Sequence, residues 1–182
     1  YRLFWKLIMG NTETYIEGLA HESFHALQGI NAPERLRKAE EIAILEDAYP
    51  WDHDKVQDAW KRELELLYQA VQAETNVEAV ELTRQFLAHR QERRELSEIT
   101  LPMVDYERKR EWLEGLAKYA ELTLGRKASL STSYEPLSSI THDPDFKNYT
   151  TQERFYSKQM NEIKRQANRE GATRFYYSGM AQ

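Results

Sequence analysis

Residues 12–29 read TETYIEGLAHESFHALQG, and this stretch decides how the rest of the chain is interpreted. Its apolar residues recur at helical spacing, which predicts an amphipathic helix over residues 13–28. Thr12 can cap the start of this helix, and Gly29 can end it. The positions that we expect to face a core are Ile16, Leu19, Ala20, Phe24 and Leu27.

The same stretch contains HESFH at residues 21–25, which fits the HEXXH pattern. On a helix, His21 and His25 lie one turn apart on the same face, so both imidazoles can reach one Zn²⁺ ion. Glu22 follows the first histidine and can accept a proton from a water molecule that the metal polarises. The alternative interpretation is a surface helix with two titratable histidines and no metal.

A catalytic zinc ion of this kind needs a third protein ligand and one open position. No third histidine follows at close spacing, so a carboxylate is favoured. Two groups of glutamates offer one: Glu40, Glu41 and Glu46 are the nearest downstream, and Glu107, Glu111 and Glu114 share one face of a later helix. The residues alone leave this choice open.

Two later stretches resemble motifs of the gluzincin metallopeptidases, the aminopeptidase-N-like clan. Residues 111–119, EWLEGLAKY, are similar to the clan's Glu-Gly-Phe-Ala-x-Tyr stretch, in which the Glu before the Gly is the third zinc ligand. Residues 176–181, YYSGMA, look like the clan's Tyr-x-x-Gly-Ala segment, in which the first Tyr stabilises the oxyanion. The resemblance covers about 25 residues, in the clan's order, and implies these roles for Glu114 and Tyr176.

The resemblance implies a mainly α, zincin-like domain over residues 1–182 that cleaves a peptide or protein substrate. In it His21, His25 and Glu114 would hold Zn²⁺, and Glu22 and Tyr176 would be catalytic. Residues 31–100 form a helical insertion that departs from the clan and that we expect to wall or cover the cleft. The clan's Gly-x-Met-x-Asn motif is not in the sequence, so nothing indicates aminopeptidase specificity.

The helix with Glu114 should pack beside the HEXXH helix, because Gly115 presents no side chain and permits a close approach. Glu107 and Glu111 are then better placed to hydrogen-bond the outer nitrogens of the histidines than to bind metal.

Periodicity and capping predict further helices and no strand pair. Asn31 and Pro33 begin a second helix that Pro50 ends, and Asp52 caps a third. Asn76 caps a fourth with a charged tail over residues 90–95, and two more cover residues 102–122 and 151–169. Residues 125–145 read as a long loop, Gly171 breaks the last long helix, and residues 1–9 fit either a strand or a helix. The inward positions are Val56, Trp60, Leu64, Leu67 and Val71 in the third helix, and Val80, Thr83 and Leu87 in the fourth.

The composition fits one helical domain with a real core: of 182 residues, 41% are hydrophobic and 30% charged. The net charge of -5 excludes a broad nucleic-acid-binding face. The lack of cysteine excludes disulfides, thiolate nucleophiles and Cys-based metal sites. No apolar run reaches the roughly 18 residues of a transmembrane helix. We expect a fragment, since Tyr1 is not Met and residues 175–182 read like the opening of an apolar helix; the compartment is not indicated.

Other polar residues are weaker candidates. We expect His53 at a helix start, His89 in solvent and His142 in a loop, where it could line a cleft. We expect Arg174 in a surface ion pair, with binding of a substrate carboxylate as the alternative. Tyr177 competes with Tyr176 for the oxyanion role, and the spacing to Gly179 favours Tyr176.

Two other classes of protein compete with the hydrolase. Glu22-x-x-His25 also matches the ligand pattern of di-iron helical bundles, but none of the other histidines considered has a glutamate three residues before it. The second alternative is a non-catalytic helical module that binds a partner and carries an accidental or relic HEXXH. A metal count separates the three: one zinc ion, two irons or none.

Overall fold

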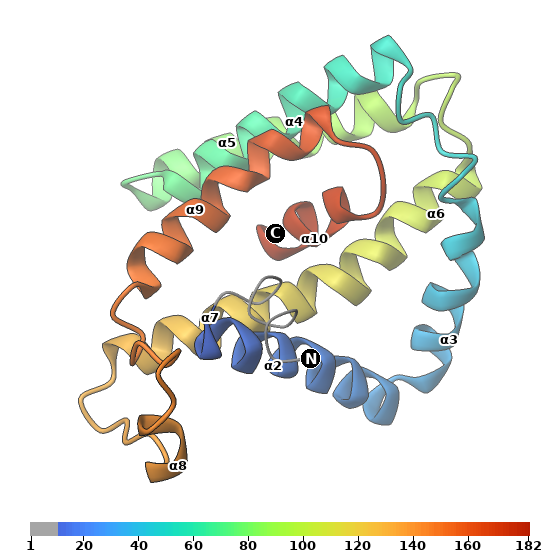
Figure 1. The fold of residues 1–182 in the computed structure, drawn as a ribbon. Coiled ribbons are helices and arrows are strands. Elements are labelled where there is room, and N and C mark those ends of the chain that lie inside the picture. Colours follow the sequence, from blue (N-terminus) through green and yellow to red (C-terminus); the bar gives the residue numbers. More distant parts are fainter. Residues whose placement is uncertain (1–10) are drawn as a thin grey trace.

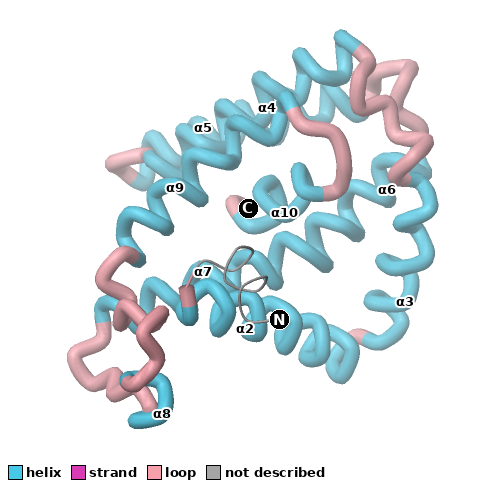
Figure 2. Tube along the Cα trace, in the orientation of Figure 1, coloured by secondary structure: helices cyan, strands magenta, loops and turns pink. Residues whose placement is uncertain are grey.

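The computed structural model describes residues 11–182, in which every regular element is a helix (Figures 1 and 2). This confirms the mainly α class. The ambiguous segment at residues 1–9 lies outside the described residues. The elements are α2 (Thr12–Asn31), α3 (Pro33–Glu41), η1 (Ile42–Leu45), α4 (Asp54–Gln72), α5 (Asn76–Arg94), α6 (Leu101–Arg110), η2 (Glu111–Gly115), α7 (Leu116–Leu130), α8 (Ser138–Thr141), α9 (Gln152–Arg165), η3 (Gln166–Asn168) and α10 (Thr173–Met180).

The helices stack in layers around α10. α4 and α5 form a hairpin, and α9 packs on α4. α6, the π-helical turn η2 and α7 follow one another without a break, and α2 packs across α7. α10 contacts α6, η2, α7 and α9. Figure 1 shows α10 between the α6–α7 helix and an upper layer that consists of α4, α5 and α9. The HEXXH helix therefore lies on the outer side of the helix that carries Glu114.

An aromatic cluster forms the centre of the core. Phe175 of α10 is fully buried, and four other rings surround it. The distance from the Phe175 ring centroid is 5.3 Å for Tyr106, 5.7 Å for Trp51, 5.9 Å for Trp60 and 6.0 Å for Tyr49. Such edge-on and tilted contacts suit the charge distribution of aromatic rings. They tie α10 to α4 and α6.

Several helix boundaries differ from the prediction because other residues satisfy the helix ends. Asn11, and not Thr12, caps α2, since its side chain accepts a hydrogen bond from the Thr14 amide at 2.8 Å. α2 also passes through Gly29, because the Ala32 amide continues the hydrogen-bond ladder to Gln28. Thr75, and not Asn76, caps α5.

Three further boundaries change the lengths of helices. α3 ends at Glu41 and a short 3₁₀ helix follows, so the second predicted helix does not reach Pro50. α4 starts at Asp54, and its N-cap is His53 instead of Asp52. The α6–α7 helix continues to Leu130, so the first part of the predicted loop at residues 125–145 is helical.

The prediction of buried faces was right for α4 and wrong for α5. Val56, Trp60, Leu64 and Leu67 are buried in α4, although Val71 is exposed. In α5, the predicted inward positions Val80, Thr83 and Leu87 are exposed, and the buried ones are Phe86, Arg90 and Arg93. Arginines of the predicted charged tail thus enter the interior, where carboxylates of other helices pair with them.

The face that α2 buries is polar. Its buried residues are Glu13, Glu17, His21 and Gln28. Leu19 and Leu27, which we expected in the core, are 50% and 51% exposed. Within residues 11–182, no helix combines the length and apolar character that crossing a membrane would require.

Candidate metal centre

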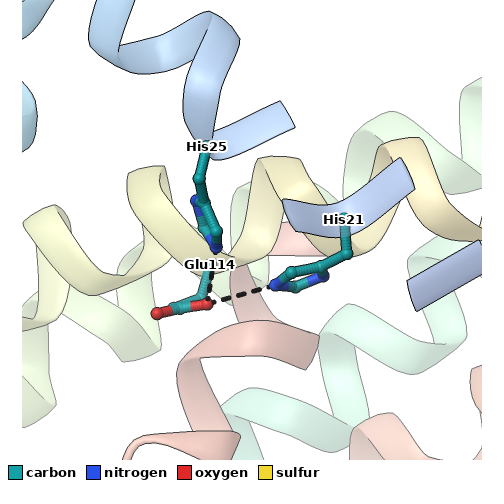
Figure 3. A group of neighbouring side chains, drawn as sticks. All are labelled: His21, His25 and Glu114. Atoms are coloured by element: carbon teal, nitrogen blue, oxygen red, sulfur yellow. Dashed lines mark ion pairs between the residues drawn. The ribbon is translucent and has the colours of Figure 1, made fainter. Parts of the chain in front are cut away.

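His21, His25 and Glu114 converge where α2 meets the π-helical turn η2 (Figure 3). Nε2 of His21 lies 3.4 Å from Oε2 of Glu114, and Nε2 of His25 lies 3.5 Å from the same oxygen. One ligand atom from each residue can be chosen such that all three lie within 4.8 Å of one another. Residues 26–113 of the sequence separate the two parts of this group, so the fold brings them together.

An observation besides the proximity of these three side chains supports a metal ion at this position. Oε2 of Glu114 is buried and has no hydrogen-bond partner among the described residues. Its distances to the two imidazoles exceed the roughly 2.7–2.9 Å of a charge-assisted hydrogen bond. A buried carboxylate oxygen held only by two long ion pairs is poorly compensated, and a cation between it and the two nitrogens would compensate it better. Two imidazoles and one carboxylate are donors that zinc and other transition metals accept.

The outer nitrogens of both histidines are occupied, which turns their Nε2 atoms towards Glu114. Nδ1 of His21 lies 3.2 Å from Oε2 of Glu121, on α7. Nδ1 of His25 lies 2.9 Å from Oε1 of Gln28. The Gln28 amide in turn donates to the carbonyl oxygens of Trp112 at 2.9 Å and Leu113 at 3.2 Å, just before Glu114. Partners of this kind fix the orientation of metal-binding imidazoles.

Glu107 and Glu111 do not have the role that we predicted for them. Glu107 pairs with Arg93 and Arg94, and Glu111 pairs with Arg90, all within the interior. Glu121 and Gln28 support the histidines instead. The sequence held a weak signal for Glu121, because it lies seven residues, about two helical turns, after Glu114.

Each carboxylate beside a histidine also has a cation on its other oxygen. Nη2 of Arg110 lies 3.0 Å from Oε1 of Glu114, and Nζ of Lys118 donates to Oε1 of Glu121 at 2.6 Å. Arg110 and Lys118 precede their partners by four and three positions, so both pairs form along the helix. The arrangement leaves one oxygen of each carboxylate for the histidines.

This environment shifts the pKa values of the ligand set in opposite directions. Burial alone would lower the pKa of His21, but the carboxylates of Glu114 and Glu121 outweigh it and raise that pKa to about 9. Burial alone would raise the pKa of Glu114, but His21, His25, Tyr176 and Arg110 hold it well below its usual range. Without metal, the group is therefore an ionised carboxylate beside protonated imidazole.

Tyr176 and Glu22 lie at the edge of the same group. The Tyr176 ring stacks on the His21 ring, with centroids 5.7 Å apart and planes 12° apart. Burial raises the pKa of the Tyr176 phenol, and its contact with the Glu114 carboxylate raises that pKa further. Glu22 itself is exposed. Tyr177 is directed elsewhere, since its hydroxyl donates to Gln159 at 2.8 Å.

The nearest glutamates downstream of the HEXXH motif, which were the alternative third ligands, lie apart from the group with His21 and His25. Glu40 is exposed on α3, and Glu41 pairs with Arg37 at 2.5 Å. Glu46 accepts a hydrogen bond from the Ala172 amide at 3.0 Å.

The other histidines and Arg174 also lie apart from it. The partners of the histidines are Glu98 for His53, Glu92 for His89 and the Ser138 carbonyl for His142. Arg174 is fully buried, so the prediction of a surface ion pair was wrong. Its guanidinium donates to backbone carbonyls at residues 166, 167 and 169, and burial lowers its pKa to about 10.

Comparisons with protein-family models, with curated proteins and with solved structures gave no match to this chain.

Proposed function

We propose that this chain is a zinc-dependent hydrolase of the gluzincin type, which cleaves peptide bonds. The observation that carries the proposal is the buried, hydrogen-bond-free oxygen of Glu114 facing Nε2 of both His21 and His25. The donor set is the two histidines and one glutamate that catalytic zinc sites of this kind use. When bound, zinc would supply a Lewis acid that polarises a carbonyl group and lowers the pKa of water.

The residues around the group have the properties that hydrolysis needs. Glu22 is exposed beside His21, so it can take a proton from a water molecule and pass it to the leaving amine. The Tyr176 hydroxyl is protonated at neutral pH, since its surroundings raise its pKa above the usual 10, and it can donate a hydrogen bond to a developing oxyanion.

Two observations bear on the other classes. Within the described residues, one group of three metal-binding side chains occurs, whereas a di-iron site needs a second carboxylate–histidine set. A non-catalytic module is favoured by apolar side chains on the outer face of α2: Tyr15 (46% exposed), Leu19 (50%), Leu27 (51%) and Ile30 (79%). In such a module, protonated imidazoles beside Glu114 would account for the polar interface without metal.

Metal analysis of the purified protein tests the proposal. We expect one zinc ion per chain, and we expect it to be lost in the His21→Ala, His25→Ala double variant, because two of three ligands are gone. The exchange of His53 and His89 for Ala is the matched control and should leave the zinc content unchanged. Equal zinc in the wild type and the His21→Ala, His25→Ala variant, or none in either, would overturn the proposal.

A further inference from the structure

We infer that Glu111 is a positioning residue for the candidate metal centre, because its carboxylate joins the turn that carries Glu114 to the helix that carries Tyr176. The inference rests on the proposed function. It also assigns a role to the hairpin α4–α5, which would brace the site from behind.

Glu111 connects three helices through one buried carboxylate. Its Oε1 atom accepts hydrogen bonds from the Ser178 hydroxyl at 2.7 Å and from Nη2 of Arg90 at 2.6 Å. Its Oε2 atom accepts a third from Nη1 of Arg90 at 3.0 Å. Glu111 is 7% exposed and Ser178 is fully buried, so little water competes for these bonds. Glu111 begins the turn that contains Glu114, and Ser178 follows Tyr176 by two positions.

The backbones of these two elements touch at the same level. A side chain on Gly115 would overlap the backbone of Gly179, and one on Gly179 would overlap the backbone at Glu111. No intervening side chain can absorb a displacement of α10, so a shift of Ser178 would move the turn. The turn is π-helical, a conformation that often occurs at functional sites and that breaks the regular hydrogen-bond ladder. It therefore depends on outside contacts to keep its shape.

Arg90 is held at its other end by α4. Its Nε atom donates to Oε1 of Glu63 at 2.8 Å, and Glu63 is fully buried. The chain of contacts runs from α4 through α5 to Glu111 and then to α10. Two of its charges are on the hairpin α4–α5, which lies in the upper layer of Figure 1 while α2 lies below the α6–α7 helix.

Glu107 provides a matched control in the same network. It is fully buried and lies one turn before Glu111. Its carboxylate pairs with Arg93 and Arg94 and accepts a hydrogen bond from Tyr49 at 2.6 Å. None of these partners is on α10. Glu107→Gln and Glu111→Gln thus each remove one buried charge opposite arginines, but only the second disturbs the contact with Ser178.

The experiment compares binding of Zn²⁺ and Co²⁺ to the wild type, Glu111→Gln and Glu107→Gln, by competition with a chelator and by the visible absorption of bound Co²⁺. We expect the metal affinity to fall at least about tenfold in Glu111→Gln, as for other groups that orient metal ligands, and to stay within about twofold in Glu107→Gln. The Co²⁺ absorption band should change in Glu111→Gln alone. Equal affinities in the two variants would overturn the inference while leaving the zinc site intact; a wild type without metal binding would overturn both.

Ser178→Ala decides the matter if Glu111→Gln does not fold, because it leaves every charge in place. When Ser178→Ala is introduced into the wild type, we expect kcat for casein hydrolysis to fall about fivefold. When it is introduced into Tyr176→Phe, kcat should fall less than about twofold, since the effects of coupled residues do not add. KM should hardly change. Equal losses in both backgrounds, or no loss in the wild type, would contradict a positioning role.

Discussion

At Glu114 the two carboxylate oxygens have separate partners, and this separation shapes the chemistry of the site. Oε1 pairs with Arg110 at 3.0 Å, whereas Oε2 faces the two imidazoles. The ion pair occupies one oxygen, so the side chain is oriented to offer a metal only the other. Arg110 also offsets the negative charge of its partner, which would leave more of the positive charge of a bound metal available to a substrate carbonyl.

Glu22 is the residue whose removal should separate metal binding from hydrolysis. Glu22→Gln keeps the shape of the side chain but cannot accept a proton, so we expect unchanged zinc content. We expect turnover of casein to fall at least about 10²-fold, the lower range for loss of a general base. Zinc analysis and a casein assay on the same preparation check this. A variant with full zinc and wild-type turnover would exclude Glu22 as the base.

Glu17 should make the stability of the protein depend on pH. Burial raises the pKa of this carboxyl to about 7, from the usual 4.5. A folded-state pKa above the unfolded one favours the folded protein below pH 4.5, and this contribution is lost as the pH rises through 7. Glu17→Gln should therefore raise the free energy of unfolding at pH 8 by about 2 kcal/mol and have little effect at pH 4.5. Urea unfolding at both pH values measures this, and Glu153→Gln, on the exposed side of α9, is the control.

The sequence identified the residues that could bind metal but not those that support them. His21, His25 and Glu114 are recognisable because their roles are tied to short motifs. Glu121 was not assigned, because its contact with His21 spans 100 positions of the chain and its spacing from Glu114 was only a weak signal. Gln28 lies three positions from His25, but its contact with the Trp112 carbonyl spans 84 positions. The long-range contacts depend on how α2 crosses η2 and α7, which the sequence does not show locally.

At the scale of elements, α2 shows why apolar periodicity gave the wrong buried face. The helix has two faces that could be buried, and we assumed that the apolar one was. Its polar face is the buried one, because other segments supply partners for it: Glu121 of α7 pairs with His21, and the Lys147 and Tyr149 amides donate to Glu13. The histidine spacing, which marks that polar face, was the better guide to packing.

Gly115 and Gly179 mark the closest approach of two elements. We expected Gly115 to permit a close approach of the HEXXH helix, but its close neighbour is α10. Gly115→Ala should lower the free energy of unfolding by about 2 kcal/mol, since a new methyl group would overlap backbone that cannot rotate away. It should also weaken zinc binding, because Glu114 precedes it.

Gly29→Ala is the control for this substitution. Its new methyl group would meet only the end of the Leu36 side chain, at 3.2 Å. Alanine also favours a helix by about 1 kcal/mol over glycine, so this variant should be as stable as the wild type or more so. Urea denaturation of the two variants gives the comparison. A Gly115→Ala protein that is as stable as Gly29→Ala would show that the contact between α10 and the turn is loose.

At the scale of the whole molecule, buried charges tie together helices that are far apart in the sequence. Arg90 and Arg93 of α5 pair with Glu63 of α4 and with Glu107 and Glu111 farther along the chain. We expected these arginines in a charged tail, because most such runs are solvated. Arg90 and Arg93 lie three positions apart and Glu107 and Glu111 four, so each pair lies on one face of its helix, which could have indicated pairing. Buried ion pairs of this kind are costly to break one partner at a time.

A zinc ion bound by His21, His25 and Glu114 should reverse how the stability of the whole protein depends on pH. In metal-free protein, the pKa of His21 is raised to about 9 from the usual 6.5. The stability that its protonation contributes is fully present below pH 6.5 and is lost as the pH rises through 9. Zinc needs neutral imidazoles, so protons compete with it less as the pH rises. We therefore expect the Tm of chelator-treated protein to fall between pH 7 and 9, and the rise in Tm caused by zinc to grow over the same range.

Thermal unfolding with and without zinc at pH 7 and 9 measures both trends. At a free zinc concentration about 100 times the Kd, binding contributes about 2.7 kcal/mol, which corresponds to a rise in Tm of about 5–10 °C for a chain of this size. The His21→Ala, His25→Ala variant is the control and should show neither trend. If zinc raises the Tm of that variant as much as that of the wild type, the metal binds elsewhere. If zinc raises the Tm of the wild type at neither pH, the three residues are a network of charged pairs instead of a metal centre.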